Sequence, residues 1–116
     1  MSDAPSPDGS LPLHPLEFRI LLVLLRGAGH GYRIVKEIEA SEAGRLYPAN
    51  LYRRIRNLLG KGLIEETGPP EDEVEPDPRR TYFRVTGLGR DVARAEARRL
   101  EELVLEARDR DLLEPA

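Results

Sequence analysis

Glycine and proline divide this chain into short segments, and this division limits the helices that it can form. The run from Leu16 to Arg26 is apolar on nearly all sides in its second half, which predicts a helix buried on several sides. Gly27-Ala28-Gly29 then ends that helix. Residues 1–15 contain four prolines and show no hydrophobic period, so we expect them to form a disordered or loosely attached arm.

A second helix is predicted from His30 to about Glu39, with His30 in a capping or packing role at its start and Gly44 as its stop. Pro48 suits the first position of a third helix, which is predicted to end near Gly60-Lys61-Gly62. The tight connection between the two helices predicts a helix-turn-helix. The inward side chains expected on the second helix are Tyr32, Ile34, Val35 and Ile38.

The third helix is amphipathic. At about 100° per residue, its apolar side carries Leu51, Ile55, Leu58 and Leu59, and its opposite side carries Asn50, Arg53, Arg56 and Asn57. Between Arg45 and Lys61 there are five basic residues and no acidic one, although the whole chain has a net charge of -3. Any binding of nucleic acid must therefore come from a local patch.

Two short strands and a long helix are predicted after the third helix. Residues 63–66 and 81–85 suit the strands, and the prolines between them predict a long tip on a two-stranded ribbon. Thr86 is placed to cap a helix that runs to about Leu113. One apolar stripe of this helix is predicted to be a dimer interface, because its second half has no obvious partner in the chain: Leu88, Val92, Leu100, Leu103 and Ala107.

The composition excludes several classes of protein. A length of 116 residues fits one domain, divided into an arm (1–15), a winged helix-turn-helix (16–85) and a dimerisation helix (86–113). The longest wholly apolar run has six residues, so no membrane span is expected. The start of the chain does not read as a signal peptide, and the absence of cysteine agrees with a cytoplasmic location. No motif predicts an enzyme, a metal site or a cofactor.

The polar face of the third helix has the chemistry needed to read DNA. Arginine bridges guanine O6 and N7, and asparagine bridges adenine N6 and N7, so Asn50, Arg53, Arg56 and Asn57 are the predicted base contacts. Pro48 and Ala49 lie at the helix N-terminus, which suits a phosphate oxygen. Tyr52 suits a phosphate contact or the core, and Arg54 suits a phosphate contact or an intramolecular ion pair.

Arg79 and Arg80, at the return of the ribbon, are further candidates for phosphate contacts. The alternative is that these two arginines neutralise the acidic residues before them, which are Glu65, Glu66, Glu71, Asp72, Glu73, Glu75 and Asp77.

The chain resembles the PadR family of transcriptional regulators over about residues 16–90. The segments that carry the resemblance are Gly29-His30-Gly31-Tyr32 with Ile34, Lys36 and Ile38, Leu51-Tyr52 with Leu58, Lys61-Gly62-Leu63-Ile64, and residues 79–86 with Gly89. The short C-terminal part, a single helix, is similar to the small-subunit branch. The resemblance implies a mainly α fold with a small β-ribbon, and a homodimeric repressor that binds an inverted-repeat operator in double-stranded DNA.

The resemblance further implies release of the DNA by a small-molecule effector or another signal. Relatives that hold flat aromatic drugs between subunits use tryptophan for stacking, and this chain has none. A drug pocket is therefore not carried over. The alternative function is a winged-helix protein-protein interaction module without DNA binding, which the negative net charge and the acidic ribbon favour.

Overall fold

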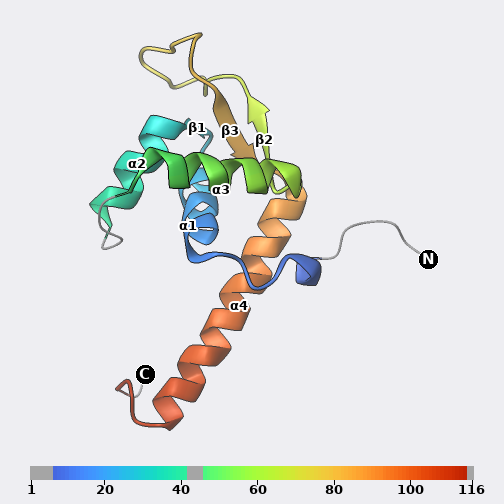
Figure 1. Cartoon of the computed structure of the whole chain (residues 1–116), viewed down its shortest axis with the longest axis vertical. Coiled ribbons are helices and arrows are strands. Elements are labelled where there is room, and N and C mark those ends of the chain that lie inside the picture. The colour runs from blue at the N-terminus through green and yellow to red at the C-terminus, as the bar shows by residue number, and fades with distance from the viewer. Residues whose placement is uncertain (1–6, 42–45, 115–116) are drawn as a thin grey trace, which may run out of the picture.

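The computed structural model describes residues 7–41 and 46–114, and its elements follow the predicted order (Figure 1). In chain order they are the 3-10 turn η1 (Pro7–Ser10), α1 (Pro15–Leu25), β1 (Gly29–His30), α2 (Gly31–Ala40), α3 (Pro48–Gly60), β2 (Ile64–Thr67), β3 (Tyr82–Val85) and α4 (Gly87–Asp109). The fold is thus mainly helical with a small antiparallel sheet. Among the described residues, no helix is both long and apolar enough to cross a membrane.

Side-chain caps and glycine set the ends of the helices. His30 Nδ1 accepts a hydrogen bond from the Arg33 N–H at the start of α2 (3.2 Å), which confirms its predicted capping role. Thr86 Oγ1 accepts from the Gly89 N–H (3.0 Å) at the start of α4, also as predicted. After α3, Gly62 adopts a left-handed conformation (φ 74°), which ends the helix where the sequence indicates. The predicted stop of α2 at Gly44 lies outside the described residues.

The sheet has three strands rather than the predicted two. Its order is β1-β3-β2, with both pairs antiparallel. In register, β1 pairs Gly29 with Phe83 and His30 with Tyr82. A two-residue strand has no periodicity to detect, so β1 was not expected, yet it brings the start of α2 against the β2–β3 hairpin.

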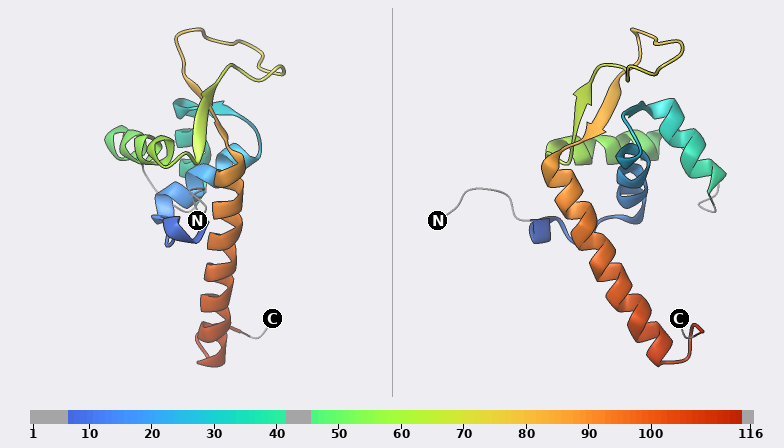
Figure 2. Two further views of the ribbon diagram at one scale, coloured as in Figure 1. Left: turned by 90° about the vertical axis from the view of Figure 1, so that its right-hand side faces the viewer. Right: turned by 180° about the vertical axis from the view of Figure 1, so that it is seen from behind.

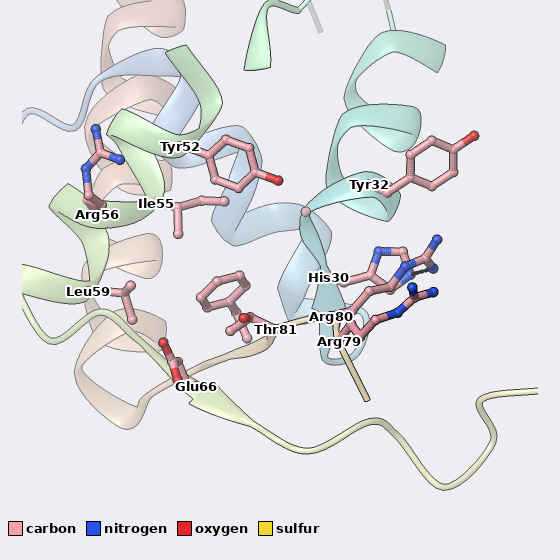
Figure 3. A pocket seen from close by; sticks show the side chains of 12 residues that line it. His30, Tyr32, Tyr52, Ile55, Arg56, Leu59, Glu66, Arg79, Arg80 and Thr81 are labelled. Atoms are coloured by element: carbon pink, nitrogen blue, oxygen red, sulfur yellow. Dashed lines mark hydrogen bonds between the residues drawn. The ribbon is translucent and has the colours of Figure 1, made fainter. Parts of the chain in front are cut away.

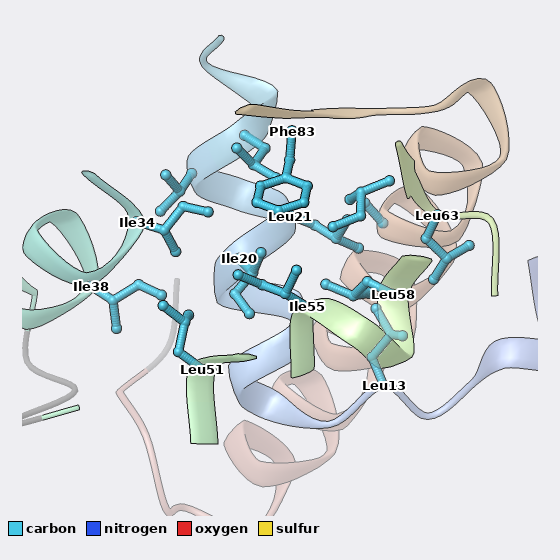
Figure 4. Packing of buried hydrophobic residues seen from close by; sticks show 14 of the residues in the cluster. Leu13, Ile20, Leu21, Ile34, Ile38, Leu51, Ile55, Leu58, Leu63 and Phe83 are labelled. Carbon is cyan, nitrogen blue, oxygen red and sulfur yellow. The ribbon is translucent and has the colours of Figure 1, made fainter. Parts of the chain in front are cut away.

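The core lies where α1 is covered by the other helices and the sheet (Figure 4). α1 contributes Ile20 and Leu21, α2 contributes Ile34 and Ile38, and α3 contributes the buried part of its apolar side, Leu51, Ile55 and Leu58. Burial of this kind stabilises a protein by about 25 cal/mol per Å² of apolar surface. The apolar side of α3 therefore fixes which side of that helix faces outward.

Two expected burials are wrong. Tyr32 is 59% exposed, because it precedes Ile34 by two residues and so lies on the opposite side of α2 from Ile34 and Ile38. On α1, Leu22 is 47% exposed, so one side of this core helix is not covered by its own chain.

The described part of the N-terminal arm is also a correction, because residues 7–14 pack onto the body. Leu13 is only 4% exposed and belongs to the core. Its N–H donates to the carboxylate of Glu96 on α4 (3.0 Å). The single apolar side chain that binds this segment gives no periodic signal, which is why composition alone pointed to a loose arm.

α4 connects the body to a projecting end. Its first half packs on α1 and β3, and its second half extends away from the other elements (Figure 2). Val92 is fully buried in its own core, and Leu88 packs against that core. Val92 is therefore out of reach of a second subunit, which corrects its predicted place in a dimer interface.

Candidate nucleic-acid interface

The outward side of α3 carries the four predicted base contacts. Asn50, Arg53, Arg56 and Asn57 are all exposed. Because Leu51, Ile55 and Leu58 anchor the opposite side, these four side chains project from a helix that is held firmly at its back. None of the four has an ion pair with the described part of the chain. Their hydrogen-bonding groups are therefore available to a ligand.

The N-terminus of α3 offers fewer donors than the sequence suggested. Pro48 has no N–H, and the Asn50 N–H already donates to the Tyr47 carbonyl (3.0 Å). Within the described residues, this leaves the Ala49 N–H as the backbone donor without a partner at this end. A phosphate oxygen would thus find one backbone donor here rather than several.

Tyr52 and Arg54 flank the outward side of α3. Tyr52 is half exposed, and it packs close to Gly31, where an added Cβ would lie 3.2 Å from the Tyr52 hydroxyl. Arg54 has its guanidinium 3.6 Å from the buried carboxylate of Glu17 on α1. Of the two alternatives for Arg54, the structure contains the intramolecular ion pair.

A cleft of about 430 Å³ separates α3 from the hairpin (Figure 3). Ile55, Leu59 and Phe83 contribute apolar side chains to it, and Tyr32 and Tyr52 contribute aromatic ones. Its cationic residues come from both elements, Arg56 from α3 and Arg79 and Arg80 from the segment just before β3. Glu66 is the acidic side chain among its described lining residues. The cleft therefore joins the two cationic parts that the sequence predicted separately.

Asp77 holds the two hairpin arginines. Its carboxylate accepts from the backbone N–H of Arg79 (2.9 Å) and from the Arg79 guanidinium (3.2 Å), and it lies 4.0 Å from Arg80. The hydrogen bonds from Arg79 lower the pKa of Asp77 below its ordinary value. One acid of the loop thus pairs with both arginines, while Arg79 keeps 89% of its side chain exposed. Charge neutralisation and availability to phosphate are both present at this position.

His30 is the second neighbour of Arg80. Its Nε2 lies 2.9 Å from Arg80 Nη1, while its Nδ1 already accepts from the Arg33 N–H. A neutral imidazole has only one acceptor nitrogen, and a guanidinium only donates. His30 therefore cannot accept from both groups, so it is a poor partner for Arg80. Burial, and then the charge of Arg80, lower the pKa of His30 below its ordinary value.

Tyr32 supports the same corner from its exposed position on α2. Its ring stacks near His30, with 6.3 Å between ring centroids. Lys36 and Arg80 lie over the Tyr32 ring at 5.3 and 5.7 Å from its centroid. Such cation–π contacts hold positive charge at the surface. The sequence gave no sign of this cluster, because it depends on β1 pairing with β3.

Beyond the body, α4 presents apolar side chains without a partner in the described chain. Leu103 of the predicted dimer stripe is 47% exposed, and Leu100 and Ala107 are partly exposed. Further exposed side chains at this end are Val104, Leu105, Leu112 and Leu113. An apolar cleft of about 330 Å³ near the middle of α4 is lined by Leu13, Phe18, Leu22 and Leu100.

Comparison with known proteins agrees with this geometry. A search among curated proteins finds no match. RosR of H. salinarum is 27% identical, with a TM-score of 0.62 over 84% of this chain and 79% of RosR. A transcriptional regulator from Clostridium thermocellum is 26% identical, with a TM-score of 0.66 over 82% of this chain and 87% of that protein.

A PadR family transcription regulator from hypervirulent Clostridium difficile shares the fold. It has a TM-score of 0.71 over 83% of this chain and 97% of that protein, at 19% identity. The model of the Transcriptional regulator PadR-like family matches residues 20–95. This match covers α1 to the first half of α4, including the outward side of α3 and the hairpin arginines. The chain therefore belongs to the PadR-like family of transcriptional regulators.

Proposed function

We propose that this protein is a dimeric transcriptional repressor that binds an inverted-repeat operator through α3 and the β2–β3 hairpin. The observation that carries the proposal is the shared cleft, which Arg56 of α3 borders together with Arg79 and Arg80 of the hairpin. A recognition helix in the major groove places its neighbouring hairpin along the phosphate backbone. Cations that border one cleft suit that arrangement.

In this proposal Asn50, Arg53, Arg56 and Asn57 contact base edges. Their exposure and their freedom from ion pairs within the described chain support this role. Tyr52 and the Ala49 N–H, which lie beside them, are placed to bind the flanking phosphates. Base contacts give the sequence preference, and phosphate contacts set the register of the helix.

Arg80 is the stronger candidate of the two hairpin arginines for a phosphate contact. At 4.0 Å its ion pair with Asp77 is long, and His30 cannot accept its hydrogen bond while capping α2. A phosphate oxygen would give this guanidinium a better acceptor than either neighbour. Arg79, which has short hydrogen bonds to Asp77, would first have to exchange them for a phosphate.

The projecting half of α4 is proposed as the dimer interface. Leu100, Leu103 and Ala107 of the predicted stripe lie there without a complete cover from the described chain. A two-fold dimer would present two copies of α3 about 34 Å apart, which is one turn of DNA, and would require a near-palindromic operator. Release of DNA by a small molecule or another signal is part of the proposal, with the identity of the signal open.

The test of DNA binding is the dependence of affinity on salt. DNA fragments that include the promoter of the protein's own gene would be footprinted, and the affinity for the protected site measured over a range of salt concentrations. Each neutralised phosphate should add about 0.9 to the slope of log K against log salt. A clearly negative slope is expected. A flat slope would show that this surface does not neutralise phosphates.

The test of base reading is a pair of single substitutions on α3. Arg53→Ala and Arg56→Ala should each weaken operator binding by about 1–3 kcal/mol and relax the base preference, because each removes one bidentate contact. Arg98→Ala, an exposed arginine on α4, is the control and should leave operator binding unchanged. If both α3 variants bind the operator as tightly as the parent protein, another element reads the DNA.

The acidic loop favours the alternative, a protein-interaction module without DNA binding. Glu71, Asp72 and Glu75 are exposed on this loop, and Val74 beside them is 91% exposed. The same salt titration separates the two functions. Retention of DNA at low salt supports the repressor, whereas no retention together with a stable protein partner supports the module.

A further inference from the structure

We infer that Glu17 is a positioning residue for the recognition helix: its carboxylate holds α3 against α1 and keeps Arg54 from contacting DNA. This inference rests on the proposed function, because it assigns a role within the same DNA-binding surface. Glu17 belongs to α1, lies on the inner side of the fold and does not border the cleft between α3 and the hairpin.

Glu17 is buried far more deeply than a glutamate of a surface helix. Only 1% of its side chain is exposed, and it lies one turn before Ile20 and Leu21 on the core side of α1. Taking a carboxylate out of water is costly unless the charge is paired and hydrogen-bonded. A residue that served only to fill space at this position would be apolar.

Both partners of Glu17 belong to the recognition helix. Lys61, the C-terminal cap residue of α3, donates from Nζ to Oε1 (3.1 Å). Arg54 places Nη1 3.6 Å from Oε2. The two carboxylate oxygens thus each face one cation, and the cations lie about two turns apart along α3. One point on α1 is therefore connected to the middle and to the end of α3.

This connection separates two neighbouring arginines by role. Arg53 is exposed and has no ion pair with the described chain, whereas 24% of the Arg54 side chain is exposed and its charge faces Glu17. A rotation of α3 about its axis would stretch the Arg54 contact and turn the base-reading side chains together. Glu17 would thus fix both the angle at which α3 enters the groove and the number of its cations that meet DNA.

The experiment is a cycle of substitutions read by the salt dependence of operator binding. Arg53→Met should lower the slope of log K against log salt by about 0.9, because it removes one cation from the interface. Arg54→Met in the parent protein should leave the slope unchanged, and Lys61 still pairs with Glu17 in that variant. Glu17→Gln should raise the slope, and adding Arg54→Met to it should lower the slope again by about 0.9.

The second readout is specificity. Glu17→Gln should reduce the ratio of operator affinity to affinity for unrelated DNA by about tenfold, comparable to the loss of one bidentate base contact. The cations that it releases still bind phosphates of any sequence. A purely structural role for Glu17 would lower the thermal stability without changing the specificity of the folded protein, so circular dichroism accompanies each measurement.

Three results would overturn the inference. They are a slope that falls in Arg54→Met as much as in Arg53→Met, a slope that Arg54→Met does not change in the Glu17→Gln protein, and unchanged specificity in a folded Glu17→Gln protein. If Glu17→Gln does not fold, the comparison of Arg53→Met with Arg54→Met decides alone. A parent protein that does not bind DNA overturns the proposed function, and this inference with it, which distinguishes that failure from the other three.

Discussion

His30 shows how one side chain can serve a helix cap and the edge of the candidate site together. It begins α2 through Nδ1, meets Arg80 through Nε2, and packs edge-on against Tyr82 at 5.4 Å between ring centroids. A protonated ring would lose its acceptor at Nδ1 and would place a second positive charge beside Arg80. The fold therefore favours the neutral imidazole.

A dependence of stability on pH follows from this preference. Burial and Arg80 lower the pKa of His30 below 6.5 in the folded chain. As the pH falls below 6.5, the unfolded chain takes up a proton at this position before the folded chain does. The free energy of unfolding contributed by His30 should therefore decrease with falling pH from that point, and should stop decreasing below the pKa of the folded state.

Urea unfolding between about pH 5 and 8 measures this effect, since an ordinary histidine titrates in that range. His30→Asn is the matched variant, because asparagine caps helices well and does not titrate there. Its stability should fall less than that of the parent protein over the same interval. Equal pH dependence in the two proteins would assign the effect to other groups.

Gly89 is the residue whose replacement the packing tolerates least. A Cβ at this position would collide with the backbone carbonyl of Leu63 and with the side chain of Val85. Gly89→Ala should therefore destabilise the protein by about 1–3 kcal/mol or more, because backbone atoms must move. Gly87→Ala is the control, since its Cβ would meet nothing within 4 Å in the same first turn of α4. Thermal unfolding of both variants checks the difference.

At the scale of elements, the sequence predicts what periodicity and punctuation encode. α3 is the clearest case, because Pro48 begins it, Gly62 ends it, and its apolar and polar sides differ at every turn. The exposure of its four predicted base-contacting residues agrees with that pattern. β1 could not be predicted, since two residues that form a strand only by pairing with β3 carry no pattern of their own.

Contacts between elements explain the other differences. Glu17 looks like any acid in the first turn of a helix, and its burial depends on Arg54 and Lys61 arriving from α3. Tyr32 looks like a core residue, but the position of Ile34 and Ile38 turns it outward. The candidate site depends on such contacts at its edges, whereas its centre on α3 is local and therefore predictable.

The segment before α1 provides a test of one such contact. Leu13→Ala should destabilise the protein by about 2–5 kcal/mol, because the side chain is buried in the core and its removal leaves a cavity. Val74→Ala is the control on the exposed hairpin loop and should change stability by less than about 0.5 kcal/mol. Chemical denaturation of the two variants makes the comparison. A loosely attached segment would instead give equal, small effects.

At the scale of the whole molecule, the two ends of α4 are in different environments. The first half of the helix belongs to the core through Val92, and the second half extends into solvent with apolar side chains exposed (Figure 2). An isolated helical end of this kind gains little stability from its own backbone. Association with a second copy would bury these side chains and join two DNA-binding surfaces in one particle.

The dimer can be tested at the exposed end of α4 without disturbing the core. Leu103→Glu places a charge in the proposed interface, where it would have no partner, and should convert a dimer to a monomer at micromolar concentrations. Glu101→Lys, about 200° away on the same helix, is the control and should remain dimeric. Light scattering measures the mass of each variant.

The same variant connects the shape of the molecule to its affinity for DNA. A Leu103→Glu monomer keeps one intact copy of α3 and should still bind a single half-site weakly, but it should lose the gain from linking two half-sites, which reaches about 100-fold or more. Its slope of log K against log salt should also fall to about half, because half as many phosphates are neutralised. Parent protein that is monomeric at micromolar concentrations would contradict this interface, and DNA affinity would then have to come from α3 and the hairpin of one chain.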